Sequence, residues 1–176
     1  MSKILISVDM QNDFVDAALG TKEAVAIIPA VCEEIRKDYD LVIATRDTHH
    51  ENYLETNEGR HLPVVHCVEN TEGWMLNEEV GNALKERESF IIIDKPTFGS
   101  EELVQVLKDH DEREPIESIT LIGLCTDICV VTNAHLVKTA FPEIPVMVKA
   151  NCCAGVTPET HEAALKTMQM CQIEII

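Results

Sequence analysis

ITLIGLCTDICVVTN, residues 119–133, is the stretch that decides the fold. It opens with apolar residues typical of a strand that is buried on both faces of a sheet. Gly123 is predicted to end this strand. Thr126 and Asp127 are residues that often cap a helix, so a helix is predicted to begin at Ile128.

Cys129 would lie in the first turn of that helix. The positive end of the helix dipole favours a thiolate there, which is the better nucleophile. Backbone N–H groups of the same turn could hold an oxyanion beside the sulfur. The alternative is that Cys129 is a small buried apolar side chain, as free cysteines often are.

The rest of the chain alternates strands and helices. Strands are predicted at Lys3–Val8, Leu41–Thr45, Phe90–Asp94, Ile119–Ile122, Val146–Val148 and Gln172–Ile176, and helices at Ala24–Lys37, Leu76–Glu86, Glu101–Asp109, Ile128–Thr139 and Pro158–Met170. Loops are expected at Gln11–Thr21, Thr48–Gly73 and, as a solvated acidic connection, Asp109–Glu114. This order predicts an α/β fold with a mostly parallel sheet of about six strands and helices on both faces, in three layers. Without repeats or linkers, residues 1–176 are expected to form a single domain.

Composition narrows the classes of partner. The net charge of -17 argues against nucleic acid and anionic membranes, because phosphates would be repelled. The chain has no apolar run of 18 residues and enters a strand at once, so neither a membrane span nor a signal peptide is expected. Seven cysteines, an odd number, favour reduced thiols and a cytoplasmic location, and the adjacent Cys152 and Cys153 are interpreted as structural.

Polar residues follow four of the predicted strands: Asp9, Asp47, Lys95 and the turn that leads to Cys129. In open α/β sheets, ligands bind beyond the carboxyl ends of the strands, so these residues should meet in one cleft. Asp9 is the candidate base for the thiol, and Lys95 would stabilise the thiolate and keep the carboxylate ionised. A Cys–His pair through His49 or His66 stays open as an alternative.

A metal site is the other use for those histidines. Asp47 and His49 are two residues apart in an extended segment, so their side chains point the same way. The candidate ligands are Asp47, His49, His66 and, as a fourth, Glu58 or Glu55; Cys67 is a rival. Two imidazoles and a carboxylate suit a divalent metal, with zinc first and iron(II) or manganese(II) as alternatives.

Five motifs together resemble the isochorismatase-like cysteine hydrolases, in particular their nicotinamidase/pyrazinamidase branch. In chain order they are VDMQNDF (8–14), RDTH (46–49), HCVENTEGW (66–74), KPTFGS (95–100) and GLCTDICV (123–130). The resemblance implies the following roles: Asp9 as base, Lys95 as catalytic lysine, Cys129 as nucleophile, Asp47, His49 and His66 as metal ligands, and the amides of Cys125 and Cys129 as oxyanion hole. It also implies a cis peptide between Leu124 and Cys125.

The same resemblance implies hydrolysis of a small carboxamide, first of all nicotinamide to nicotinate and ammonia in NAD salvage, through a Cys129 thioester. Homo-oligomers are expected on the same ground. Two pieces depart from the branch. LPVVHC replaces the usual WPxHC, so Leu62 or Pro63 stands where a Trp would stack on the ring, and Asn70–Thr71 replaces the usual GT after HCV. The pocket is expected to use Phe14 and Leu124, with Tyr53 or Phe98 as the compensating aromatic residue.

Three alternatives to nicotinamide hydrolysis stay open. The first is a related hydrolase that acts on another small amide or an N-carbamoyl compound. The second is a ligand-binding member of the family without turnover. The third is a thiol switch that uses Cys125 and Cys129.

Overall fold

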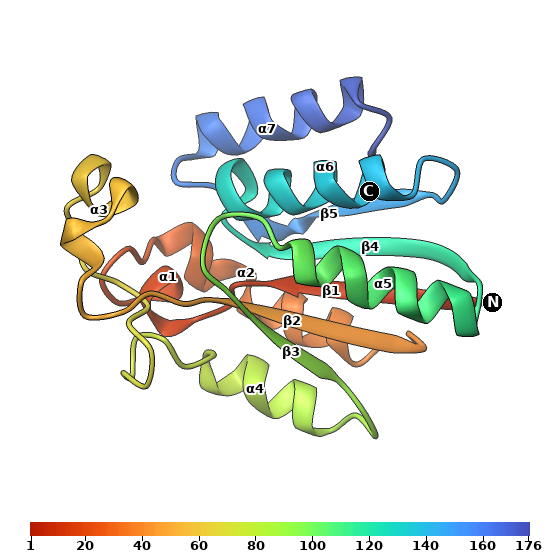
Figure 1. The fold of residues 1–176 in the computed structure, drawn as a ribbon, viewed down its shortest axis with the longest axis horizontal. Coiled ribbons are helices and arrows are strands. Elements are labelled where there is room, and N and C mark those ends of the chain that lie inside the picture. Colours follow the sequence, from red (N-terminus) through yellow and green to blue (C-terminus); the bar gives the residue numbers. More distant parts are fainter.

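Six parallel strands form one sheet in the computed structural model, which describes residues 1–176. They are β1 (Ser2–Val8), β2 (Leu41–Asp47), β3 (Ile91–Lys95), β4 (Ile116–Leu124), β5 (Val146–Ala154) and β6 (Glu174–Ile175). The helices are α1 (Asn12–Val15), α2 (Lys22–Ile35), α3 (Asn57–His61), α4 (Glu78–Lys85), α5 (Glu101–Arg113), α6 (Val131–Ala140) and α7 (Pro158–Met170), with short turns η1 (Tyr53–Glu55) and η2 (Thr126–Val130). The predicted three-layer α/β fold is confirmed (Figure 1).

The strand order is β3-β2-β1-β4-β5-β6, so the chain moves outward from β1 to one edge and returns to build the other half. The direction of winding changes between β1 and β4, where Val8 pairs with Gly123. Sheets wound in this way bind ligands beyond the carboxyl ends of the strands at that change. α3 lies at this end of the sheet, on the left in Figure 1, opposite the N-terminus.

Two apolar cores fill the space between the sheet and its helices. Successive residues of a strand point to opposite faces, so Ile4 and Ile6 enter one core and Leu5 enters the other. α5, α6 and α7 cover the first face, and α1, α2 and α4 cover the second. None of the helices combines the length and the hydrophobicity needed to cross a bilayer.

The prediction of a solvated connection at Asp109–Glu114 is wrong, because α5 continues through this acidic segment to Arg113. Leu103 and Leu107 are buried on the inner face, and the acidic side chains stay on the outer face. The Arg113 side chain also donates to the Asp109 carbonyl, so a helix accommodates this charge.

The prediction that Gly123 ends its strand is also wrong, because β4 continues past it to Leu124. Its φ of +114° belongs to the region that favours glycine, and a Cβ there would lie 2.1 Å from the Val8 carbonyl oxygen. The glycine therefore permits the close approach of β4 to β1 instead of ending the strand. β5 is likewise longer than predicted and includes Cys152 and Cys153, and all seven cysteines are free.

The predicted loops contain short helices. α1 lies within the segment Gln11–Thr21, and η1 and α3 lie within Thr48–Gly73. Only α3 among them has a side-chain cap, because the Thr56 side chain accepts from the Gly59 N–H. Such short helices bury too few periodic apolar residues to be visible as a pattern.

Candidate active site

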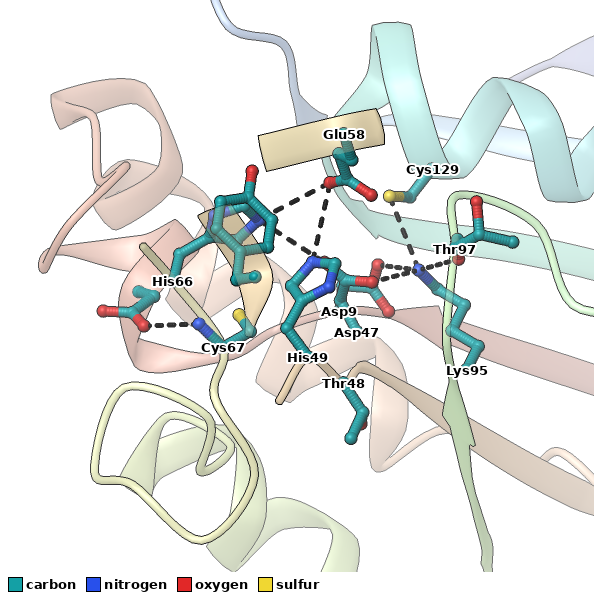
Figure 2. A network of polar contacts seen from close by, with 12 residues as sticks. Asp9, Asp47, Thr48, His49, Glu58, His66, Cys67, Lys95, Thr97 and Cys129 are labelled. Atoms are coloured by element: carbon teal, nitrogen blue, oxygen red, sulfur yellow. Dashed lines mark hydrogen bonds and ion pairs between the residues drawn. The ribbon is translucent and has the colours of Figure 1, made fainter. Parts of the chain in front are cut away.

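Three charged or nucleophilic side chains meet at the change of winding. Lys95 is the last residue of β3, Asp9 follows β1, and Cys129 lies in the turn after β4. The Lys95 Nζ lies 2.6 Å from Asp9 Oδ2 and 3.6 Å from Cys129 Sγ, and it donates to the Thr97 carbonyl at 3.0 Å (Figure 2). The ammonium therefore bridges the Asp9 carboxyl group and the Cys129 thiol at the carboxyl ends of the strands.

Burial dominates the electrostatics of this group, since the Asp9 and Lys95 side chains are both inaccessible to solvent. Burial raises the pKa of Asp9 above its usual range, while the Lys95 ammonium opposes the rise. The Thr45 hydroxyl donates to Asp9 Oδ1 at 2.6 Å and also favours the carboxylate. Lys95 stays charged: burial favours the neutral amine, but nearby carboxylates, Asp9 foremost, raise its pKa.

The Cys129 thiol departs from the sequence prediction of a favoured thiolate. Burial raises its pKa well above the usual value, and the Asp9 carboxylate adds to this, although the Lys95 ammonium opposes it. Both burial and Asp9 thus favour the protonated form of the sulfur. A proton acceptor is needed before the sulfur can act as a nucleophile.

The turn that carries Cys129 also differs from the predicted capped helix. η2 is a single π-helical turn without a side-chain cap, and α6 begins only at Val131. Thr126 and Asp127 serve elsewhere: the Thr126 hydroxyl is hydrogen-bonded to the His161 ring, and the Asp127 carboxylate accepts from the Val156 N–H. The Leu124–Cys125 peptide is cis, as the resemblance implies.

A second cluster lies next to the first. Asp47, His49, Glu58 and His66 each direct one donor atom to a common centre, and these atoms all lie within 4.8 Å of one another. Asp47 Oδ2 is 2.9 Å from His49 Nε2 and 3.6 Å from His66 Nε2, and Glu58 Oε1 is 3.5 Å from His49 Nε2 (Figure 2). Asp47 also links the clusters, because its Oδ1 lies 3.5 Å from the Lys95 Nζ.

The donor chemistry fits a divalent metal. His66 Nδ1 donates to the Val64 carbonyl at 2.8 Å, so the Nε2 of the neutral ring presents a lone pair to the centre. His49 Nε2 is buried and, despite its nearness to Asp47, forms no aligned hydrogen bond. Two imidazoles and two carboxylates suit zinc, iron(II) or manganese(II). Glu58 joins the cluster, whereas its rivals Glu55 and Cys67 do not.

Two positioning residues were missed in the sequence. The Gln11 side chain accepts from the Asp47 N–H at 2.7 Å and donates to the Asp47 and Trp74 carbonyls, so it clamps the end of β2. The Asp13 carboxylate accepts from the Cys67 N–H at 2.7 Å and thereby holds the segment next to His66. Amide and carboxylate residues directly after a buried strand were the available signal.

Cys129 of the first cluster and Asp47, Glu58 and His66 of the second line one cavity of about 220 Å³. Its lining residues are Phe14, Leu19, Thr21, Ala24, Asp47, Glu58, Leu62, His66, Phe98, Leu124, Cys125, Ile128, Cys129, Gly155 and Val156. The predicted pocket residues Phe14 and Leu124 are among them. Of the two possible compensating aromatics, Phe98 lines the cavity, whereas Tyr53 is fully buried against the His49 and His66 rings.

Comparison with known proteins identified similar structures. A pyrazinamidase of Pyrococcus horikoshii in complex with zinc is 30% identical and has a TM-score of 0.83 over 100% of this chain and 99% of its own. A pyrazinamidase/nicotinamidase from Streptococcus mutans is 26% identical, with a TM-score of 0.85 over 99% and 100%. A protein from L. infantum in complex with nicotinate, 19% identical with a TM-score of 0.82 over 99% and 92%, shares the fold.

No curated protein matched the sequence. The model of the isochorismatase domain matches residues 3–176, which is almost the whole chain. The strand order, the five motifs and the two adjacent clusters agree with this match, and the protein therefore belongs to the isochorismatase family of hydrolases.

Proposed function

We propose that this protein is a metal-containing cysteine amidohydrolase that converts nicotinamide to nicotinate and ammonia. One observation carries the proposal: Cys129 lines one small cavity together with Asp47, Glu58 and His66 of the four-donor cluster, and Lys95 and Asp9 lie directly behind the Cys129 sulfur. A small amide in this cavity would meet the sulfur nucleophile, with the cation and the base next to that sulfur. The zinc complex of the Pyrococcus horikoshii pyrazinamidase supports zinc as the metal.

In the proposed first half-reaction, Asp9 accepts the Cys129 thiol proton, and the sulfur forms a bond to the carboxamide carbon. The Lys95 ammonium stabilises the thiolate on the way. The carbonyl oxygen becomes an oxyanion that the N–H groups of Cys125 and Cys129 hold. The Cys125 N–H donates to no protein acceptor, which supports this role.

The C–N bond then breaks, and ammonia leaves with the proton that Asp9 returns. In the second half-reaction, Asp9 takes a proton from water, and the resulting oxygen attacks the thioester carbon. The C–S bond breaks, and Asp9 returns the proton to the Cys129 sulfur. The product is the carboxylic acid, which loses its proton to water and leaves as the carboxylate.

Asp47, His49, Glu58 and His66 would hold the metal. A bound divalent ion, with its waters, supplies a template that orients the ring nitrogen of the substrate, which is a role that metals play without generating the nucleophile. These donors adjoin the Cys129 cluster, since Asp47 Oδ1 lies 3.5 Å from the Lys95 Nζ.

Nicotinamide is favoured because the cavity is small and mostly apolar, with Phe14 and Phe98 available to contact a ring. The names of the Pyrococcus and Streptococcus relatives point to the same substrate class. A second candidate is another small uncharged amide or N-carbamoyl compound, since Leu62 lines the wall where the branch usually has Trp. No Lys or Arg lines the cavity, which disfavours substrates that carry their own carboxylate.

The deciding experiment is ammonia release from nicotinamide, pyrazinamide and a panel of small carbamoyl compounds, with and without a chelator. We expect nicotinamide to be hydrolysed, activity to fall in the chelator and return with zinc, and Cys129→Ala to remove turnover while the protein stays folded. Hydrolysis of a carbamoyl compound with nicotinamide untouched would overturn the substrate. Activity that survives Cys129→Ala would overturn the cysteine mechanism.

A ligand-binding protein without turnover would bind nicotinamide and release no ammonia. A thiol switch would form a Cys125–Cys129 disulfide under mild oxidant. Homo-oligomers, a cytoplasmic location and a role in NAD salvage stay predictions, which size-exclusion chromatography and cell fractionation would test.

A further inference from the structure

Asn133 is a fully buried polar residue near the start of α6, one helical turn beyond Cys129. Its Nδ2 donates to the Cys129 carbonyl at 2.8 Å and to the Phe98 carbonyl at 3.1 Å. Its Oδ1 accepts from the Ser100 N–H at 3.0 Å. A single side chain thus connects the turn of the nucleophile with the segment after β3.

That segment, residues 96–100, borders the site in two ways. Its Thr97 carbonyl accepts from the Lys95 Nζ at 3.0 Å, and its Phe98 side chain lines the cavity. It also lies directly on α6, since a Cβ at Gly99 would be 2.6 Å from the Leu136 side chain. A shift of this segment would change both the lysine and one wall of the pocket.

Asn133 is the only group of the chain that donates to the Phe98 carbonyl or accepts from the Ser100 N–H. Ser100 is buried, so without Asn133 its backbone N–H would lose its partner away from water, which is costly. The segment is therefore held in one position relative to Cys129 by this amide.

We propose that Asn133 is a positioning residue that keeps segment 96–100 in register with the nucleophile and so sets the Lys95–Cys129 contact and the Phe98 wall. The inference rests on the proposed function for its turnover readout only. Asn133 does not line the cavity, so it acts through Cys129 and through the segment.

The variant Asn133→Ser separates the bond to Cys129 from the bonds to segment 96–100. A serine in a helix can still donate to the carbonyl four residues earlier, here that of Cys129, but it cannot reach Phe98 or Ser100. Asn133→Asp is the second variant, since it keeps an acceptor for the Ser100 N–H and loses both donors. The matched control is His135→Ala, which removes a side-chain bond to the carbonyl four residues earlier, Val131, in the same helix.

The measurements are kcat and KM for nicotinamide, and the pH at which iodoacetamide alkylates Cys129 at half its maximal rate, followed on the Cys129 peptide by mass spectrometry. We expect Asn133→Ser and Asn133→Asp to lower kcat by about 10-fold or more, because small misplacements cost that much, and to raise KM. The half-maximal pH should rise as the ammonium moves away. For His135→Ala, kcat and KM should stay within about twofold of the wild-type values, because this change lies outside the Asn133 contacts.

Wild-type kcat, KM and alkylation profile in folded Asn133→Ser would overturn the proposal. An equal loss in His135→Ala would also overturn it, because the effect would then be general destabilisation of α6. If the wild-type protein does not hydrolyse nicotinamide, the proposed function fails, and the alkylation profile still decides the role of Asn133.

Discussion

The two clusters of the site are built differently. The sulfur, ammonium and carboxylate of the Cys129 cluster come from the ends of β4, β3 and β1, respectively. β1 and β4 are the two central strands of the sheet, and β3 is an edge strand. The metal cluster takes only Asp47 from a strand; His49, Glu58 and His66 come from the long segment between β2 and α4. Glu58 has the most exposed side chain of the four, at 19%. The first cluster is thus part of the core, and the second depends on a loop.

This difference indicates which of the two clusters tolerates mutation without loss of the fold. A buried charge in the core has no water to replace a lost partner, so a change there affects folding as well as chemistry. A ligand on a loop can be lost with little effect on the fold, because loops tolerate change better than the elements they connect. Mutations should therefore separate the clusters by their effect on stability.

The largest effect is expected for Asp9→Asn. It removes the base and leaves the buried Lys95 ammonium without its nearest carboxylate. Activity should fall by about 10³-fold or more, and the free energy of unfolding by about 3 kcal/mol. Nicotinamide turnover and urea unfolding measure the two. Unchanged stability would show that the core cluster is not held by this ion pair and would break the comparison.

Next in size is His66→Ala. Zinc affinity should fall by more than about 100-fold. Loss of a group that only orients a ligand costs up to about 100-fold, and loss of the ligand itself should cost more. The free energy of unfolding of the metal-free protein should change far less in His66→Ala than in Asp9→Asn. Competition with a chromogenic chelator gives the affinity. Destabilisation of the metal-free protein as large as that of Asp9→Asn would contradict the assignment of this cluster to a tolerant loop.

A smaller effect is expected for Gln11→Ala, which removes the clamp on the Asp47 backbone. Zinc affinity should fall by about 10- to 100-fold, as for other groups that orient a ligand. The half-buried Asn12, which donates to the Glu72 carbonyl, offers the control variant Asn12→Ala, for which zinc affinity should be unchanged. Equal losses in both would mean that the whole segment, and not Asp47, had moved.

The smallest effect is a shift in pH dependence. Asp9 must be ionised to act as base, and its pKa is raised by burial, so kcat/KM should fall about tenfold per pH unit on the acidic side, beginning above the range of an exposed aspartate. Thr45→Val removes a hydrogen bond that favours the carboxylate, which should move this acidic limb to higher pH. A limb that stays in place, or moves to lower pH, would assign it to another group.

Much of the fold follows from local pattern. The apolar runs of β1, β2 and β4 are dense enough to be recognised as buried strands, and Asp9, Asp47 and Lys95 stand at strand ends where a parallel sheet gathers them. The continuation of α5 through Asp109–Glu114 was missed because an exposed charged helix face has no apolar period. The π-helical turn was missed because Thr126 and Asp127 bind distant partners instead of capping a helix.

The amino-acid sequence by itself determined the alternation of strands and helices, the residues at the strand ends and the motifs of the family. Only the tertiary structure decided that Glu58 and not Glu55 lies with Asp47, His49 and His66, that Phe98 and not Tyr53 lines the cavity, and that burial raises the pKa of the Cys129 thiol. The physical reason is distance along the chain. Strand and helix preferences depend on near neighbours, whereas burial and hydrogen-bond partners, such as the Asn133 bonds that span 33 and 35 residues, depend on segments that only folding brings together.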